Sequence, residues 1–170
     1  MSGSAIISPC GLYRYTLHRQ IPSALRWVKP CLFGLLNPSK ADATVDDNTL
    51  RRGLSFARSW GCTSLTFINL FAFRATDPRE LMAAWQRGSD VIGPDNDRYI
   101  LEQLDAHCRI GIIVAAWGTH PLTKRRRYIQ KLFAEAGAQC LGTTKAGDPR
   151  HPLYLSSDVQ LTPWALPGGV

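Results

Sequence analysis

Short apolar runs that stop at polar loops divide the chain into regular segments. The clearest run spans Cys31 to Leu36 and has the length of a fully buried strand. Similar runs occupy Thr63 to Leu70 and Ile110 to Ala116, and a shorter one occupies Ala138 to Leu141. Each is bounded by residues that favour turns. The pattern therefore predicts four buried strands.

Helical patterns follow the polar loops after these runs. Leu50, Leu54 and Ala57 repeat at helical spacing, and Asp46 or Asp47 can cap the start of that helix. A second helix start is marked by an aspartate, a proline and a glutamate at the positions that a helix start favours. The helices after the first are expected over residues 77 to 88, 95 to 108 and 122 to 136.

The two ends of the chain carry weaker patterns. Residues 11 to 18 alternate between apolar and polar side chains, which predicts an antiparallel or edge strand at the N-terminal side. Residues 157 to 170 are expected to form a tail. Strands that alternate with helices predict one α/β domain over residues 1 to 170 with its core at about 25 to 156. We expect a three-layer α/β/α sandwich around a short, mainly parallel four-stranded sheet.

The composition argues against several classes of protein. An apolar fraction of 45% is ordinary for a globular domain, and no run approaches the length that spans a bilayer. Residues 1 to 11 lack the pattern of a signal peptide, so we expect a cytoplasmic protein without a membrane partner. The five cysteines contain no CxxC pair, which favours reduced thiols over disulfides or a metal site. No glycine-rich phosphate loop occurs, and no cofactor is expected.

The charge of the chain suggests a polyanionic partner. A net charge of +7 favours nucleic acid or a nucleotide, and a basic surface without a specific partner is the alternative. The basic run 124 to 127 opens a predicted helix, where it is either a solvated face or a phosphate contact. Arg51, Arg52 and Arg58 lie off the apolar stripe of their helix, and the same two interpretations apply to them.

Polar side chains collect where the predicted strands end. In a parallel sheet these positions share one edge, where α/β folds bind ligands. We therefore expect one cleft lined by amide, guanidinium, indole and imidazole groups. Its members are Asn37, Pro38, Ser39, Asn69, Arg74, Trp117, Gly118 and His151. The serine of this set lacks the flanking glycines of a serine-hydrolase nucleophile.

The order of these motifs carries two resemblances. The segments LLNPSKAD, INLFAFRATDPREL, VAAWGTHP and HPLYL follow one another as in the uracil-DNA glycosylase superfamily, most closely in its mismatch-type branch. This resemblance spans about residues 31 to 155. The whole pattern of NPSxAD, DDxT, NLFAFRATDP, AAWG and GxPxHPLYL is also identified as that of an uncharacterised bacterial and phage family, known only as a domain of unknown function.

The glycosylase resemblance implies a similar fold and the hydrolysis of an N-glycosidic bond in nucleic acid or a nucleotide. Asn37 falls where an amide places the attacking water, and His151 where the late motif contacts the leaving base. Leu153 matches the region that wedges into the duplex, and Arg74 or Ser39 would grip the substrate. Such cleavage passes through a cation-like sugar, so it needs a placed water and help for the departing base.

The first motif departs from the mismatch-type pattern. It contains Asp42, Asp46 and Asp47 where those enzymes have a glycine and an aromatic-rich stretch. These carboxylates could contact the substrate, hold a metal in a phosphoryl or sugar enzyme, or serve as helix caps and a turn. A module that binds nucleic acid or a modified base without cleaving it is a further alternative.

Each candidate also has a purely structural interpretation. Arg74 can pair with Asp77 across its loop, and Trp117 can be a half-buried packing residue at a strand end. His151 is held extended by the proline that follows it, and Asn37 can be a turn former.

Overall fold

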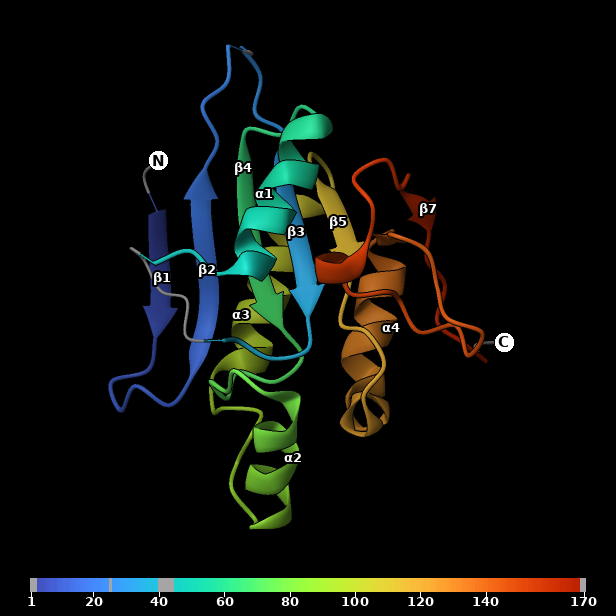
Figure 1. Cartoon of the computed structure of the whole chain (residues 1–170). Coiled ribbons are helices and arrows are strands. Elements are labelled where there is room, and N and C mark those ends of the chain that lie inside the picture. The colour runs from blue at the N-terminus through green and yellow to red at the C-terminus, as the bar shows by residue number, and fades with distance from the viewer. Residues whose placement is uncertain (1–2, 25, 40–44, 169–170) are drawn as a thin grey trace.

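A computed structural model describes residues 3–24, 26–39 and 45–168. These residues form a seven-stranded sheet with the order β1-β2-β4-β3-β5-β6-β7 (Figure 1). The strands are β1 Gly3–Ile7, β2 Arg14–Gln20, β3 Pro30–Leu35, β4 Ser64–Asn69, β5 Ile112–Ala115, β6 Gln139–Cys140 and β7 Thr162–Pro163. No helix of this described part is long and apolar enough to cross a membrane. The chain has the α/β class that its sequence predicts.

The centre of the sheet is parallel and its margins are antiparallel. β4, β3, β5 and β6 run in one direction, whereas β1 and β2 on one side and β7 on the other run against their neighbours. The chain passes from β3 to β4 on one side and later returns to β5 on the other side of β3. The strand order therefore reverses between β3 and β5, and open α/β sheets bind ligands at such a reversal.

The prediction of a four-stranded sheet is wrong, because it describes only the parallel part. β1 pairs with the outer side of β2, so the segment predicted as an edge strand over residues 11 to 18 is an internal antiparallel strand. β7 has two residues, which are too few to show an alternating pattern. The predicted tail nevertheless adds Trp164 to the core, with 5% of its surface exposed.

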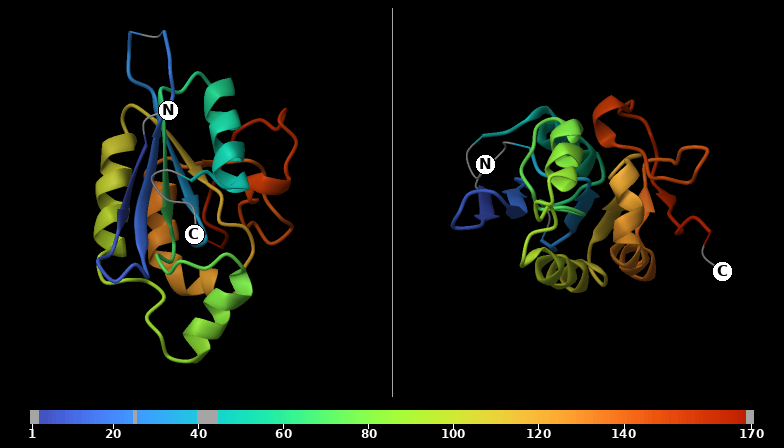
Figure 2. Two further views of the ribbon diagram at one scale, coloured as in Figure 1. Left: turned by 60° about the vertical axis from the view of Figure 1, so that its left-hand side comes forward. Right: turned by 90° about the horizontal axis from the view of Figure 1, so that it is seen from below.

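Helices cover both faces of the sheet (Figure 2). α1 Asn48–Ser59 lies on one face, and α3 Asn96–His107 and α4 Arg127–Glu135 lie on the other. α2 Pro78–Gln86 stands beyond the carboxyl ends of the strands (Figure 1). The first turns of the helix predicted over residues 122 to 136 form a separate 3₁₀ helix, η1 Pro121–Arg126, and a second one is η2 Pro152–Tyr154.

Alternate side chains of β3 belong to two different hydrophobic clusters, one on each face of the sheet. Cys31, Phe33 and Leu35 pack in the cluster beneath α1. Leu32, together with Leu36 just after the strand, packs in the cluster beneath α3 and α4. The strand is therefore buried on both faces, as its continuous apolar run predicts.

Two glycines allow the helices to lie close to the sheet. A Cβ atom at Gly34 of β3 would come within 2.4 Å of the Phe133 ring of α4. A Cβ atom at Gly53 of α1 would come within 2.6 Å of the Phe67 ring of β4. Both helices thus pack on the sheet through positions that have no room for a side chain.

Candidate functional site

A pocket of about 330 Å³ opens at the carboxyl ends of β3 and β5. The loops after β3, β4 and β5 line it together with the beginnings of α1 and α2 and the helix η2. It therefore lies where the strand order reverses. Its size is at the lower end of small-molecule sites, which suits a small, largely enclosed ligand.

Asn37 follows β3 and lines this pocket. Its amide nitrogen donates to the carbonyls of Pro38 at 3.2 Å and Ala75 at 2.8 Å. The Ala75 N–H donates to the Pro38 carbonyl at 2.9 Å, so the loops after β3 and β4 are joined here. Because both amide hydrogens are directed to carbonyls, the amide oxygen is the acceptor that remains. No described residue donates to it, and a water or ligand can do so.

His151 lines the same pocket from the turn before η2. Its Nδ1 accepts from the Leu153 N–H at 3.3 Å and thereby caps the 3₁₀ helix. Burial lowers the pKa of His151 to about 4, and the nearby Asp47 carboxylate offsets only part of that effect. The imidazole is neutral at pH 7. With Nδ1 used as an acceptor, Nε2 carries the proton and is the donor of the ring.

A second histidine, His120, lines the pocket and was missed by the sequence analysis. It also precedes a proline and also begins a 3₁₀ helix, where its Nδ1 accepts from the Leu122 N–H at 3.3 Å. Burial lowers its pKa, and an interaction with the Pro78 carbonyl offsets part of that effect. The repeated His-Pro dipeptide was the signal in the sequence that could have identified it.

The pocket is uncharged and combines apolar walls with a few polar groups. Among the described residues, its lining contains no aspartate, glutamate, lysine or arginine. Its two histidines, His120 and His151, have pKa values lowered by burial and are neutral at pH 7. The pocket therefore suits a neutral ligand with hydrogen-bonding groups better than a phosphate or a carboxylate.

Asp46 and Asp47 both have partners within the fold. The Asp46 carboxylate accepts from Nε and Nη2 of the buried Arg19 at 3.0 and 2.8 Å. Asp47 caps α1 by accepting from the Leu50 N–H at 2.7 Å, and its second oxygen accepts from the Ser39 hydroxyl. The capping interpretation is confirmed for Asp47, whereas Asp46 forms a half-buried ion pair.

The third carboxylate of the predicted cluster, Asp42, lies outside the described residues. Within the part of the chain that the structure covers, no group of three or more histidine, cysteine, aspartate or glutamate side chains could hold a metal ion. Asp46 and Asp47 are directed to different partners, a guanidinium and a helix start.

A smaller cavity of about 40 Å³ adjoins the pocket, and we call it the polar annex. Its polar lining consists of Arg14, Asn37, Ser39, Asp47, Thr49 and His151. Four of these residues, Asn37, Ser39, Thr49 and His151, also line the pocket. Arg14 and Asp47 line the annex but not the pocket, so the charged side chains of this site lie in the annex.

Other predicted residues form the far wall and the rim. Trp117 is 2% exposed and packs edge to face against Phe133 and Trp164, so it lines the pocket as part of the core. Gly118 follows it with φ of 69°, a conformation that glycine adopts without strain. The residues of η2 lie at the rim. Leu153 lines the pocket, and the neighbouring Tyr154 is 85% exposed.

Asn69 and Arg74, like Pro38, Asp46 and Asp47, do not line the pocket. Asn69 is 1% exposed, and neither polar atom of its side chain has a hydrogen-bond partner among the described residues. Arg74 donates to the Gly11 carbonyl at 3.1 Å. Its proposed partner Asp77 instead pairs with Arg79 and caps α2. The alternative in which Arg74 pairs with Asp77 is therefore wrong.

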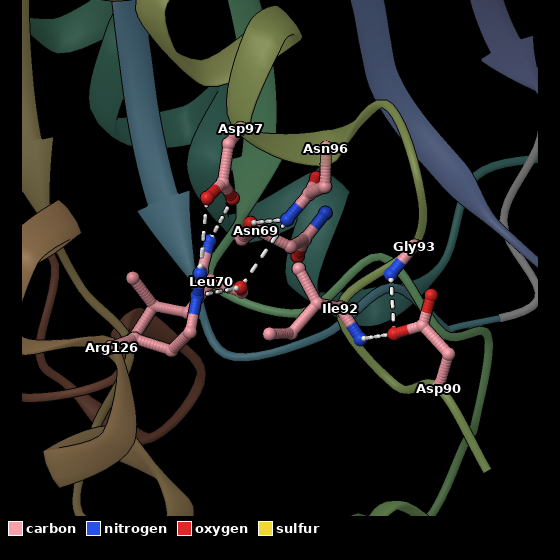
Figure 3. A network of polar contacts seen from close by, with 8 residues as sticks. All are labelled: Asn69, Leu70, Asp90, Ile92, Gly93, Asn96, Asp97 and Arg126. Carbon is pink, nitrogen blue, oxygen red and sulfur yellow. Dashed lines mark hydrogen bonds and ion pairs between the residues drawn. The ribbon is translucent and has the colours of Figure 1, made fainter.

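A buried polar network holds the elements behind the pocket together (Figure 3). The Asn96 amide donates to the carbonyls of Asn69 at 3.0 Å and Leu70 at 3.2 Å. Arg126 donates through Nε to the Leu70 carbonyl at 2.9 Å and pairs with Asp97. The start of α3, the end of β4 and η1 are thereby joined. Arg126 is 7% exposed, so neither a solvated face nor a phosphate contact describes it.

Neighbouring arginines of the predicted basic segments also bind within the chain. The Arg125 guanidinium lies 4.4 Å from the centre of the Trp85 ring. Arg127 donates to a main-chain carbonyl of the C-terminal tail. Arg52 of α1 donates to the Leu155 carbonyl and so holds the segment after η2. These three arginines therefore hold other segments of the chain in place.

Comparison with known proteins supports one family. Residues 14–153 match a family model described as "Protein of unknown function (DUF1643)". The chain belongs to this family. No curated protein and no solved structure matches the chain. The motifs that indicate an uncharacterised family in the sequence, from NPS to HPLYL, fall within or at the end of the matched residues.

Proposed function

We propose that the protein hydrolyses an N-glycosidic bond in nucleic acid or a nucleoside, with the base in the pocket. The observation that carries this proposal is an uncharged pocket whose wall offers the Asn37 amide oxygen and the neutral imidazole of His151. A nucleobase is neutral, flat and rich in donors and acceptors, which matches such a lining. The order of the motifs, which resembles that of uracil-DNA glycosylases, supports a similar fold and substrate class.

Asn37 would act on the attacking water, and His151 would act on the departing base. The Asn37 amide oxygen can accept from a water molecule and hold it toward the sugar carbon. The His151 Nε2–H can donate to the departing base as negative charge develops on it. A neutral donor suits this step because the charge forms only in the transition state, and a placed water supplies the nucleophile without a strong base.

A nucleic-acid substrate would have to present its base outside the duplex. Extrusion of a base costs about a few kcal/mol, which contacts around the pocket must offset. The exposed Tyr154 at the rim offers an aromatic surface for this purpose, and the net charge of +7 favours a polyanion. Leu153 lines the pocket itself, so we expect it to contact the base rather than the neighbouring stack.

The test is an assay for base release. Single- and double-stranded oligonucleotides carrying uracil, mismatches or common lesions are incubated with the protein, and abasic sites are measured with and without EDTA. We expect cleavage that survives EDTA and falls at least about 100-fold in Asn37→Ala, because the water loses its acceptor. Thr119→Val is the matched control, since Thr119 lines the pocket but donates to Asp148 at 3.1 Å.

Three other results would contradict this proposal. Salt-sensitive binding without base release would identify a binding module for nucleic acid or a modified base. Activity that EDTA abolishes, and that Asp46→Ala or Asp47→Ala removes, would identify a metal-dependent enzyme. The absence of any binding at low salt would exclude nucleic acid as the partner, because a basic protein should show at least nonspecific affinity.

A further inference from the structure

The polar annex has the room and the lining to hold bound water. Its volume of about 40 Å³ exceeds the roughly 10–15 Å³ that a cavity needs to hold a water molecule. A buried water also needs two to four polar partners, which the annex provides. Asn37 and His151 stand in the shared wall, so such a water lies directly beside a ligand in the pocket.

A β-bulge directs Arg14 to this side of the sheet. Ile6 of β1 pairs with Thr16, whereas the next residue, Ile7, pairs with Arg14. Tyr15 is therefore an extra residue in β2. Because side chains alternate between faces, one extra residue reverses the faces of those that precede it.

The ring contacts of β2 agree with this reversal. Leu17 packs in the cluster beneath α1, whereas the bulged Tyr15 stacks on Tyr99 of α3 at 5.0 Å. Arg14 returns to the face of α1 and lines the annex with only 2% of its surface exposed. A buried guanidinium is costly to desolvate, and Arg14 shares the lining of the annex with Asp47.

An independent observation points to water beside the annex. Asn69 pairs with Leu35 in the sheet register, and it follows Phe67 on the same face of β4. Leu35 and Phe67 both line the annex. The Asn69 amide is buried, and neither of its polar atoms has a partner among the described residues. Buried amides of this kind are normally satisfied, and bound water is the usual partner when protein groups are lacking.

We propose that the annex holds the nucleophilic water of the reaction, and that Asp47 accepts its proton while Arg14 fixes its position. This inference rests on the proposed function. The water oxygen forms a bond to the anomeric carbon, and the bond from that carbon to the base breaks with its electron pair going to the base. One water proton moves to the Asp47 carboxylate, and the His151 Nε2–H stabilises the departing base.

The variant Asp47→Asn tests this role with little change to the fold. Asparagine caps helices as well as aspartate does, so α1 keeps its first hydrogen bond while the proton acceptor is lost. Asp77→Asn is the matched control, because Asp77 caps α2 in the same way and lies outside both cavities. With uracil-containing oligonucleotides we expect kcat to fall at least about 100-fold in Asp47→Asn with KM unchanged, and both to stay unchanged in Asp77→Asn.

A crystal structure of the wild-type protein without substrate provides the second measurement. We expect an ordered water in the annex within hydrogen-bond distance of Asp47 and Asn37. An annex without water, or an unchanged kcat in Asp47→Asn of an active protein, would overturn this inference and leave the proposed function standing. A wild-type protein that releases no base would refute the proposed function instead, and with it the catalytic role of the water.

Discussion

His120 and His151 occupy equivalent positions on two different loops of the pocket. Each precedes a proline, and each begins a 3₁₀ helix by accepting a main-chain N–H on Nδ1 at 3.3 Å. Burial lowers the pKa of both imidazoles. The local sequence therefore produces the same capped turn twice, and it fixes the same ring nitrogen as the acceptor in both places.

The two histidines differ in what faces the rest of the ring. His120 interacts with the Pro78 carbonyl and so connects η1 to the start of α2. His151 lines the polar annex as well as the pocket, and the charge that acts on it is the Asp47 carboxylate. One histidine is thus used within the fold, and the other keeps a donor for a ligand. A shared motif consequently does not imply a shared role.

Replacement of each histidine by asparagine should separate these roles by activity. Asparagine retains an oxygen that can cap the 3₁₀ helix but lacks the distant Nε2–H. We expect base release by His151→Asn to fall about 100-fold in kcat, because the leaving base loses its donor. His120→Asn should stay within a few-fold of the wild type. Equal losses in the two variants, measured by steady-state kinetics, would contradict the assignment of different roles to the two histidines.

The pH dependence of stability should sharpen the contrast between His151 and His120. The folded-state pKa of His151 is about 4, against an ordinary value of 6.5, so the unfolded chain binds a proton that the folded chain does not. The free energy of unfolding should therefore fall by about 3 kcal/mol as the pH decreases from 6.5 to 4.

Urea unfolding of the wild type and of His151→Asn across this range measures the contribution. The variant should lose about 3 kcal/mol less than the wild type, since the remaining histidines contribute equally to both proteins. Identical slopes with pH in the two proteins would show that His151 is not held neutral by burial.

The smallest expected effect is the loss of folding stability when the His120 imidazole is replaced. In His120→Asn the interaction with the Pro78 carbonyl is lost while the cap remains, so we expect a destabilisation of about 1 kcal/mol at pH 7. His151→Asn should cost less at the same pH because no described residue accepts from its Nε2. Urea denaturation gives both values, and a larger cost for His151→Asn would reverse the assignment.

The parallel strands and their helices follow from the local sequence. The run from Cys31 to Leu36 is apolar without interruption, and β3 is buried on both faces as a result. Asp77 and Pro78 mark the start of α2, where the aspartate caps the helix as expected. β7 could not be predicted, since two residues beside a proline have no periodicity of their own. It exists because β6 leaves an edge that the tail can pair with.

The candidate site also contains residues that the local sequence identifies and residues that only tertiary contacts bring there. Asn37 and His151 are both found at the pocket because they follow a strand end or begin a turn, positions that the sequence reveals. Asn69 follows the same rule, yet its side chain is buried and lines neither cavity. Arg14 has no motif around it and reaches the annex only through the bulge in β2.

The sequence by itself determined the α/β class, the order of the parallel strands and helices along the chain, the capped starts of α1 and α2, and the strand-end motifs. These features depend on hydrophobic period and on residues a few positions apart, which are local properties. The tertiary structure alone decided the width of the sheet, the face to which Arg14 points, and the partners of Arg126 and Asp46. Each of these depends on contacts between distant segments, where register, burial and the nearest available partner determine what a side chain does.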